Sequence, residues 1–402
     1  MDEITQHSST VAGLRGANQI AMRAWNERLV LTLVRRHGAL ARAEIARMTG
    51  LSAQTASVIV RQLETDGLLS RGAPQRGRVG QPSLPMSLAP EGVFFLGLKI
   101  GRRTLELVAT DLLGKIRARR SRRYSWPTVT GVLDFARTAI AEVLTELGAD
   151  VAGRIAGLGI AMPFQLWEWA PLIGAPDAEM ADWQMRDIRA ELAAAFGFPV
   201  FVANDGSAAC AAELMFGSAA LPADFCYFYL GFFIGGGVVV NGSLFTGHNG
   251  NAGALGSMLV PDGAGGMVQL LNIASLAVLE RRMNAAGLDA ERLWQSPDWQ
   301  VPPEILDPWI RASAAAIAHA IAGCAAVVGF QAAMIDGWLP PVVLKALVAE
   351  TRAHLAGISL TGITPPLPIE GSVGPAARAL GAASLPMTER FFVDMNAIQR
   401  IP

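Results

Sequence analysis

The sequence predicts an α/β body made of two related lobes, preceded by a winged helix-turn-helix domain. Three observations support this fold class: positive charge gathers at the front of the chain, a strand–turn–strand pattern occurs twice, and helices alternate with strands between its copies. The 402 residues suffice for two or three domains. With 51% hydrophobic and 17% charged residues, the chain can bury a large core, which excludes global disorder.

The net charge of −1 conceals two oppositely charged regions. Residues 1–126 hold 20 Lys/Arg and 9 Asp/Glu, whereas residues 127–402 hold 13 and 25. A basic front end on an acidic body indicates that nucleic acid is bound at the front end only. The expected parts are a flexible tail over 1–20, a winged helix-turn-helix domain over 21–90, a first lobe over 91–210 completed by 383–402, and a second lobe over 211–382.

Three helices are predicted in the front domain. They run from near Asn26 to Gly38, from Arg42 to Met48 and from Ala53 to Asp66, and Ser52 is the N-cap of the third. The short turn between the last two has the spacing of a helix-turn-helix motif. The third helix leaves polar side chains outward near its N-terminus, where a recognition helix reads base edges. The residues of this face are Ser52, Gln54, Thr55, Ser57 and Arg61.

A basic, glycine-rich loop follows the three helices. It runs from Arg71 to Pro82 without an acidic residue, and the strand Leu84–Leu88 comes next. Arginines on a flexible backbone suit phosphates and a narrow minor groove. The third helix alone is also compatible with an ordinary solvated face, but the loop favours DNA binding. The loop residues expected on DNA are Arg71, Arg76, Arg78 and Gln81.

Cysteine usage and hydropathy predict a cytoplasmic protein outside the membrane. Cys210, Cys226 and Cys324 show no CxxC spacing and lie in apolar sequence, which is typical of reduced, buried thiols. The first residues lack the pattern of a signal peptide. Residues 312–335 contain no Asp, Glu, Lys or Arg and are long enough to cross ~30 Å of hydrocarbon. Because this stretch is mostly Ala and Gly, a buried helix followed by a short strand is the better interpretation.

The body contains an internal duplication. A strand from Val93 to Gly101, a tight turn and a second strand from Thr104 to Thr110 form the first copy. The second copy runs from Asp224 to Ile234, with a turn predicted at Gly235–Gly237 and a strand from Val238 to Val240. Two facing lobes form a cleft, where a small ligand usually binds. Between the copies, the alternating elements expected are helix 131–148, strand 155–161, helix 182–196 and strand 199–203.

The order and spacing of several motifs resemble the ROK family of repressors, open reading frames and sugar kinases, and above all its repressor branch. The motifs are GLKIG (97–101), VANDGSAACAAE (202–213), IGGGVVVNGSLFTGHNGNAGALGSM (234–258), IDGWLP (335–340) and GSVGPAARALGAA (371–383). The resemblance covers the chain from about Arg23. It implies an actin-like, ribonuclease H-like duplicated body of the sugar-kinase type. It also implies a sugar effector and a homodimer or homotetramer that binds operator DNA.

The phosphate-binding turns of the family's kinases look altered. Where the kinases carry an acid that helps to hold Mg²⁺-nucleotide, this sequence has Lys99. In the second phosphate loop the glycines Gly235–Gly237 remain, but Phe232 and Phe233 replace small polar residues. We therefore expect structural turns, no cofactor, no catalytic residues and no enzyme activity. The alternative is an active ATP-dependent sugar kinase with a regulatory DNA-binding head.

The resemblance points to the Asn204–Asp205 pair as the centre of a ligand site. In the family's kinases the corresponding Asp is the general base for the sugar hydroxyl, and a carboxylate beside an amide suits adjacent hydroxyls. Asp205 as a simple helix cap is the alternative. Ala254 and Ser257 stand where the family has a sugar-binding Glu and a zinc-binding His, and no cysteines follow. A metal site is therefore not expected.

Four further residues are candidates to complete the ligand site. Gln165 and Trp167 follow Pro163 where the family's first-lobe sugar loop should lie, and tryptophan can stack on a sugar ring. Packing of the tryptophans in a lobe or subunit surface is equally compatible with the sequence. His248 and Asn249 lie in a glycine-rich loop. Together, these features predict a cytoplasmic repressor of carbohydrate-utilisation genes, and a ligand-independent regulator with a vestigial body is the second alternative.

Overall fold

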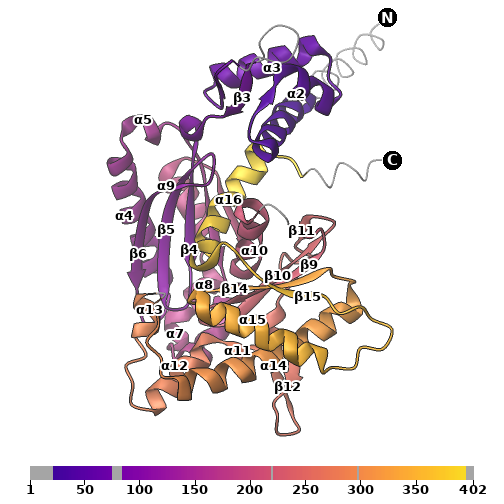
Figure 1. Ribbon diagram of the computed structural model, residues 1–402. Coiled ribbons are helices and arrows are strands. Elements are labelled where there is room, and N and C mark those ends of the chain that lie inside the picture. Colours follow the sequence, from indigo (N-terminus) through magenta and orange to yellow (C-terminus); the bar gives the residue numbers. More distant parts are fainter. Residues whose placement is uncertain (1–20, 75–83, 219–220, 297, 395–402) are drawn as a thin grey trace, which may run out of the picture.

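The computed structural model describes residues 21–74, 84–218, 221–296 and 298–394, and shows a small head seated on a two-lobed body (Figure 1). In the head, β1, β3 and β2 form an antiparallel sheet beside the helices. The Ser52 side chain accepts a hydrogen bond from the Thr55 amide, which confirms the predicted N-cap. The elements of the head are a helix over 21–37, β1 (Leu40–Ala41), α2 (Arg42–Thr49), α3 (Ala53–Thr65), β2 (Leu69–Arg71) and β3 (Pro85–Leu88).

Each lobe is built on a five-stranded sheet of the same topology, which confirms the duplication. In each lobe the first three strands along the chain pair in antiparallel order. Two further strands extend the sheet on the other side of the first strand and run parallel to it. The strands of the first sheet are β4 (Phe94–Ile100), β5 (Thr104–Asp111), β6 (Ile116–Arg123), β7 (Ile155–Met162) and β8 (Val200–Asn204). Those of the second are β9 (Phe225–Leu230), β10 (Ile234–Val240), β11 (Ser243–Phe245), β14 (Ala332–Gly337) and β15 (Leu367–Glu370).

Helices cover both sheets, and the hairpin of β12 (Leu259–Pro261) and β13 (Met267–Gln269) extends from the second lobe. The helices between β6 and β9 in the chain are α4 (Val129–Leu147), α5 (Ala149–Ala152), α6 (Ala170–Ile173), α7 (Asp177–Met180), α8 (Asp182–Met185), α9 (Ile188–Phe196) and α10 (Asp205–Phe216). The later helices are α11 (Leu271–Ala274), α12 (Leu276–Ala285), α13 (Arg292–Gln295), α14 (Pro303–Val327), α15 (Pro341–Ala356) and α16 (Ala377–Phe391).

Three predicted elements are wrong in detail. The first helix of the head, expected from near Asn26, already includes residue 21. The helix expected over 182–196 is interrupted, because Arg186 is extended and Asp187 caps a new helix, α9, by accepting hydrogen bonds from two backbone amides. Gly235–Gly237, where a turn is expected, belongs instead to β10, and the chain reverses between Leu230 and Ile234. A Cβ atom on Gly236 would lie 2.2 Å from the Tyr227 carbonyl oxygen. These glycines therefore allow close packing within the second lobe.

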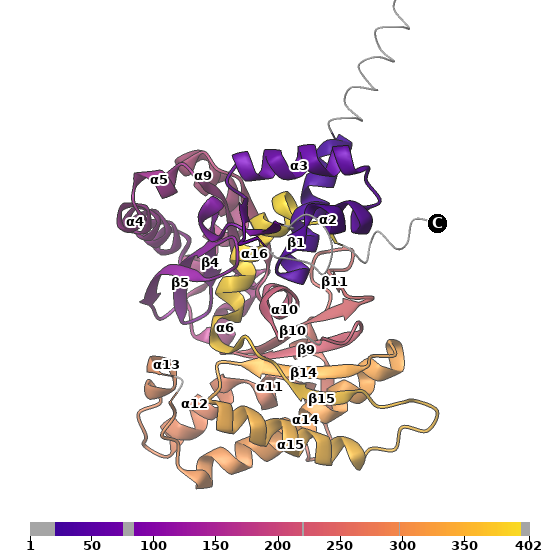
Figure 2. The ribbon, with the colours of Figure 1, turned by 45° about the horizontal axis from the view of Figure 1, so that its top comes forward.

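Helices α10 and α16 pack against each other between the two sheets, and α16 lies against β4 and β7 (Figure 2). Small residues allow this contact: a Cβ atom on Gly381 would lie 1.8 Å from the carbonyl oxygen of Ala208. Likewise, a Cβ atom on Gly159 would lie 1.7 Å from the carbonyl oxygen of Ala382. Close packing of this kind leaves little room for one helix to move without the other.

The positive charge at the front of the chain belongs only partly to the head. Residues 1–90 hold 11 Lys/Arg and 6 Asp/Glu, while residues 91–126 hold 9 and 3. The second group is concentrated on β6, an edge strand of the first lobe. Four of its arginines form ion pairs there, namely Arg117, Arg119, Arg120 and Arg123; Arg120, for example, lies 2.8 and 2.7 Å from Glu142 and Glu146. The ion pairs of β6 therefore use part of this positive charge within the body, whereas the residues expected on DNA all lie in the head.

The apolar stretch within 312–335 forms the end of α14 and the start of β14, which confirms the predicted helix and strand. Among the described residues, α14 is the one helix long and apolar enough to cross a membrane. Half of its most apolar 18-residue segment is buried inside the protein. Cys210, Cys226 and Cys324 are free and buried, as predicted.

Candidate functional site

The outer face of α3 is open to solvent. Ser52, Gln54, Thr55 and Arg61 are exposed, and Ser57 is half-buried. Val58 lies among them with 54% of its surface exposed, although it is a large apolar side chain. Short polar groups, an apolar contact for a thymine methyl group and a cation on one exposed helix face are what major-groove recognition requires. Contact of these residues with DNA remains a prediction.

The glycine-rich loop that is predicted to form the wing is fixed to α3 at its first residue, Arg71, by an ion pair. Arg71 donates to Glu64 at 2.8 Å, and Arg42 lies 3.5 Å from the same carboxylate. The hydrogen bond and charge of Glu64 raise the pKa of Arg71. This pairing gives Arg71 a structural partner that competes with DNA phosphate. Arg76, Arg78 and Gln81 lie outside the described residues.

A cleft of about 320 Å³ lies between the two lobes. The first lobe contributes the segment 163–172 and the ends of β4 and β8, while the second lobe contributes β10 and the loops before and after it. Of the predicted ligand residues, Gln165, Asn204 and Asp205 line this cleft. Glu168 and Trp169, which belong to the same predicted sugar loop as Gln165, also line it. Polar lining residues that the sequence did not single out are Arg102, Asn251, Gln269 and Arg378.

Asn204 and Asp205 divide the two roles that the sequence left open. The Asn204 side chain caps α10, because its Oδ1 accepts hydrogen bonds from the amides of Gly206 and Ser207 at 2.9 and 3.3 Å. The carboxylate of Asp205 instead accepts a hydrogen bond from Nη1 of Arg378 at 3.2 Å. A hydroxyl group of a ligand would therefore meet a carboxylate that already holds a cation.

Lys99 is buried beside the cleft, with 8% of its surface exposed. Its Nζ donates to the Thr104 hydroxyl. Burial, together with the positive charge of Arg378, lowers the pKa of Lys99 to about 7. Lys99 is thus a cation whose charge is costly here.

Arg102 lies against two aromatic rings at the cleft. Its guanidinium carbon is 4.0 Å from the ring centre of Trp169 and 4.6 Å from that of Phe233. The two rings also pack against each other, with their centres 5.2 Å apart. Burial lowers the pKa of Arg102 to about 10, so the group stays charged at neutral pH.

The other predicted ligand residues lie in different surroundings. Gln165 is exposed at the edge of the cleft with a φ of 52°, a left-handed conformation that is rare outside glycine. Trp167 packs against the main hydrophobic core and does not line the cleft. His248 and Asn249 are exposed in their loop, where Asn251 reaches the cleft in their place.

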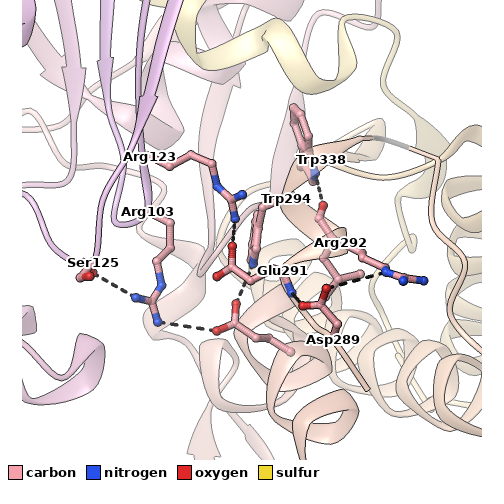
Figure 3. A network of polar contacts seen from close by, with 10 residues as sticks. Arg103, Arg123, Ser125, Asp289, Glu291, Arg292, Trp294 and Trp338 are labelled. Atoms are coloured by element: carbon pink, nitrogen blue, oxygen red, sulfur yellow. Dashed lines mark hydrogen bonds and ion pairs between the residues drawn. The ribbon is translucent and has the colours of Figure 1, made fainter. Parts of the chain in front are cut away.

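Polar contacts connect the two lobes at one side of the cleft (Figure 3). Arg103, in the turn between β4 and β5, lies 3.6 Å from Glu280 of α12 and donates to the Ser125 carbonyl oxygen at 3.0 Å. Arg123, at the end of β6, pairs with Glu291. The indole of Trp294 donates to Glu280 at 2.7 Å and fixes its carboxylate. These contacts cross between lobes, so they stabilise the arrangement of the lobes seen here.

The head is attached to the ends of α10 and α16 that lie away from the cleft. Arg28, in helix 21–37, donates to the carbonyl oxygens of Phe392 and Thr388 at 2.9 and 3.1 Å. Arg35 donates to the Met215 carbonyl oxygen at 2.8 Å and lies about 5 Å from the ring centre of Phe216. Apolar residues of the head and of α16 share one hydrophobic cluster. The head and the body are therefore packed together through buried contacts.

A second, apolar cavity of about 740 Å³ lies in the second lobe between the β10–β11 hairpin and the end of α14. It has few polar groups and lies outside the cleft described above. Among the described residues, no group of three or more His, Cys, Asp and Glu side chains is placed to hold a metal ion.

Comparison with known proteins agrees with this architecture. A model described as "ROK family" matches residues 95–294, and one described as "MarR family" matches residues 25–78. The uncharacterized protein y4fQ of Sinorhizobium fredii is 28% identical over 377 residues, which are 92% of this chain and 93% of that protein. The xylose repressor of Bacillus subtilis is 23% identical over 244 residues, which are 61% of this chain and 62% of the repressor.

Solved structures show the same fold. A ROK family transcriptional regulator, described as a homolog of the E. coli MLC protein, has a TM-score of 0.67 at 19% identity and covers 92% of this chain and 97% of its own. A ROK family glucokinase from Streptomyces griseus has a TM-score of 0.56 at 23% identity and covers 73% of this chain and 98% of its own. The chain therefore carries a ROK-family domain behind a MarR-type winged-helix domain, as its sequence motifs predicted.

Proposed function

We propose that this protein is a cytoplasmic, sequence-specific transcriptional regulator. Its winged-helix head binds operator DNA, and its cleft binds a sugar that changes this binding. One observation carries the proposal: α10 and α16 both begin at the cleft, at the Asp205–Arg378 pair, and end at contacts with helix 21–37 of the head. Two distinct sites are thus connected by packed structure, as allosteric control requires.

A sugar in the cleft affects the head if the closed and open arrangements of the lobes bind it with different affinity. A hydroxyl group that donates to Asp205 changes the environment of Arg378, and so the contact between the first turns of α10 and α16. Because these helices touch through Gly381 and Ala208, a shift of one helix is passed to the other. The position of the head on the body then depends on the ligand.

The surroundings of the cleft support a protein that binds a sugar without phosphorylating it. Lys99 replaces the acid of the kinase turn, and its buried cation does not hold Mg²⁺. Phe232 and Phe233 are buried and pack edge to face, with ring centres 4.9 Å apart, in the loop that approaches phosphate in kinases. Without a phosphoryl donor, Asp205 has no reaction to assist as a base. ATP-dependent transfer of phosphate to a hexose would support the alternative, an active sugar kinase.

We further propose that the protein represses carbohydrate-utilisation genes as a homodimer or homotetramer. The name of the similar xylose repressor supports this class of target. A two-fold symmetric dimer presents two α3 helices to successive major grooves, so the operator should be roughly palindromic. The second alternative is a regulator that binds no ligand. Ala254 and Ser257 favour it, because they line the cleft without a carboxylate or an imidazole.

The proposal is tested by titrating the protein on its selected operator with neutral and acidic monosaccharides. We expect at least one sugar to change operator affinity by about 5- to 150-fold, the usual range of allosteric coupling. A protein that binds its operator but responds to no sugar would favour the ligand-independent regulator.

A further inference from the structure

We infer that the effector is a sugar with a negatively charged group, a phosphate or a carboxylate, and that Arg102 binds this group. The inference rests on the proposed function, because it names the chemical class of the ligand for the same cleft. It starts from the charges that line the cleft.

Arg102 forms no ion pair of its own among the described residues, and Asp205, whose negative charge raises the pKa of Arg102 against the effect of burial, is paired with Arg378. Arg102 is buried, with 6% of its surface exposed, and it lines the cleft. Its Nε atom has no hydrogen-bond acceptor, and among the described residues no carboxylate pairs with its guanidinium group. The rings of Trp169 and Phe233 stabilise the cation in part through cation–π contacts. A buried cation without an anion remains costly, and an anionic ligand would relieve that cost.

The carboxylates that act on Arg102 and Lys99 already have other partners. Asp205 pairs with Arg378 at 3.2 Å, and Glu106 lies 2.6 Å from Arg119. Glu168 lines the cleft but is exposed at its edge. Even with Asp205 counted, the inner part of the cleft holds an excess of positive charge from Arg102, Arg378 and the neighbouring Lys99.

The remaining lining fits a sugar rather than an inorganic ion alone. The cleft volume of about 320 Å³ lies at the lower end of small-ligand sites. Asp205 and the amides of Gln165, Asn251 and Gln269 can bind several hydroxyl groups from both lobes. A planar guanidinium group matches the paired oxygens of carboxylate and phosphate, so Arg102 can bind either one through two hydrogen bonds.

Lys99 supplies an independent readout of a bound anion. Burial and the charge of Arg378 lower its pKa, the charge of Arg119 acts in the same sense, and Glu106 and Asp205 oppose them. An anion bound beside Arg102 raises this pKa from about 7, so binding at pH 8 should take up protons. Calorimetry in two buffers of different ionisation enthalpy measures this uptake. A neutral sugar should produce little of it.

The decisive experiment compares matched ligands on the full chain. Thermal unfolding and calorimetry are run with glucose, glucose 6-phosphate and glucuronate, with the galactose and mannose sets, and with inorganic phosphate. We expect one acidic sugar to bind at least about tenfold more tightly than its neutral counterpart. The phosphate and uronate members of the preferred set show which anionic group the cleft takes.

Arg102→Met tests the assigned residue. It should reduce the preference for the acidic sugar to less than about threefold, while the free protein unfolds at the same or a higher temperature because an unpaired buried charge is removed. Arg186→Met is the matched control: Arg186 is already paired with Glu191 on the surface at 2.7 Å, and this variant should keep the full preference.

Several results would overturn the inference. They are equal binding of neutral and acidic sugars, an unchanged preference in Arg102→Met, or no effect of any sugar or of inorganic phosphate. Arg102-dependent binding of Mg·ATP without a sugar would assign the arginine to a nucleotide instead. Operator binding is measured on the same samples. A protein that prefers its operator but ignores every acidic sugar would refute this inference and leave DNA recognition intact.

Discussion

The carboxylate of Asp205 lies 3.2 Å from Nη1 of Arg378, and this ion pair joins the first turns of α10 and α16. Both helices pass from the cleft to the head, where α10 ends beside Arg35 and α16 beside Arg28. The neighbouring Tyr229 ring is 4.9 Å from the guanidinium carbon of Arg378. Burial opposes the charge of Arg378, but the nearby Tyr229 and Asp205 outweigh it and raise its pKa. The pair is thus a stable connection at the centre of the molecule.

Arg378→Met should separate DNA binding from ligand response. The methionine keeps the apolar stem but removes the ion pair with Asp205, so the first turns of α10 and α16 lose their polar connection. We expect operator affinity without effector to stay within about threefold, while the effect of the sugar on that affinity falls by about tenfold. Fluorescence anisotropy with labelled operator measures both quantities. Arg352→Met, on α15, is the control, and an unchanged sugar response in Arg378→Met would show that the pair transmits nothing.

Gly381→Ala should force α10 and α16 apart. Its new Cβ atom would meet the Ala208 carbonyl oxygen, a backbone atom that cannot rotate away. We expect a loss of unfolding free energy of about 1–3 kcal/mol or more, measured by urea denaturation. Gly357→Ala is the control, because its Cβ atom would have only an ordinary contact 3.4 Å from the His354 carbonyl oxygen. Equal stability of the two variants would contradict the close packing.

Lys99→Met should stabilise the protein in a pH-dependent way. The folded pKa of Lys99 lies near 7, whereas an unfolded lysine titrates near 10.5. Above the unfolded pKa both states are neutral and burial of charge costs nothing. As pH falls towards 7, the unfolded state alone gains the proton, so wild type loses stability relative to the variant. Denaturation at pH 6, 7.5 and 9 should therefore show the largest gap at the lowest pH. A gap that does not vary with pH would mean that Lys99 is not buried as a cation.

The outer face of α3 should determine DNA affinity. Gln54→Ala and Arg61→Ala should each weaken operator binding by about 1–3 kcal/mol while leaving folding intact, because both side chains are exposed. Ser52→Ala should differ, since it removes a helix cap and costs about 1 kcal/mol of stability. Thr65→Ala, at the end of α3, is the control. If Arg61 contacts phosphate, its variant should also show a weaker dependence of affinity on salt.

The sequence predicted the head well because its signals are local. A capping serine, glycine stops and apolar periodicity placed α2 and α3 within about two residues of their observed bounds. The Gly235–Gly237 segment was mistaken for a turn because glycine serves turns and close packing alike. Its place in β10 is set by tertiary packing in the second lobe, which no short sequence window contains.

The cleft was predicted only in part. Asn204, Asp205 and Gln165 line it as predicted. Arg102 and Arg378 also line it, although they lie near opposite ends of the amino-acid sequence of the body. In the sequence Arg102 looked like an ordinary turn residue, and no spacing rule predicts that Arg378 lies next to Asp205. Trp169 follows the predicted Trp167 by two residues, and the short helical turn over Leu166–Trp169 decides which indole faces the cleft. Such choices depend on local helical phase and tertiary contact rather than on residue type.

The most direct test of the account is a comparison of affinities on DNA fragments selected from the source genome. The full chain is incubated with the fragmented genome, retained fragments are sequenced, and the affinity for the preferred fragment is compared with that for bulk duplex, with and without sugar. We expect the preferred fragment to bind at least about 10³-fold more tightly and one sugar to change that preference. Equal affinity for all fragments would contradict the claim that this protein recognises an operator.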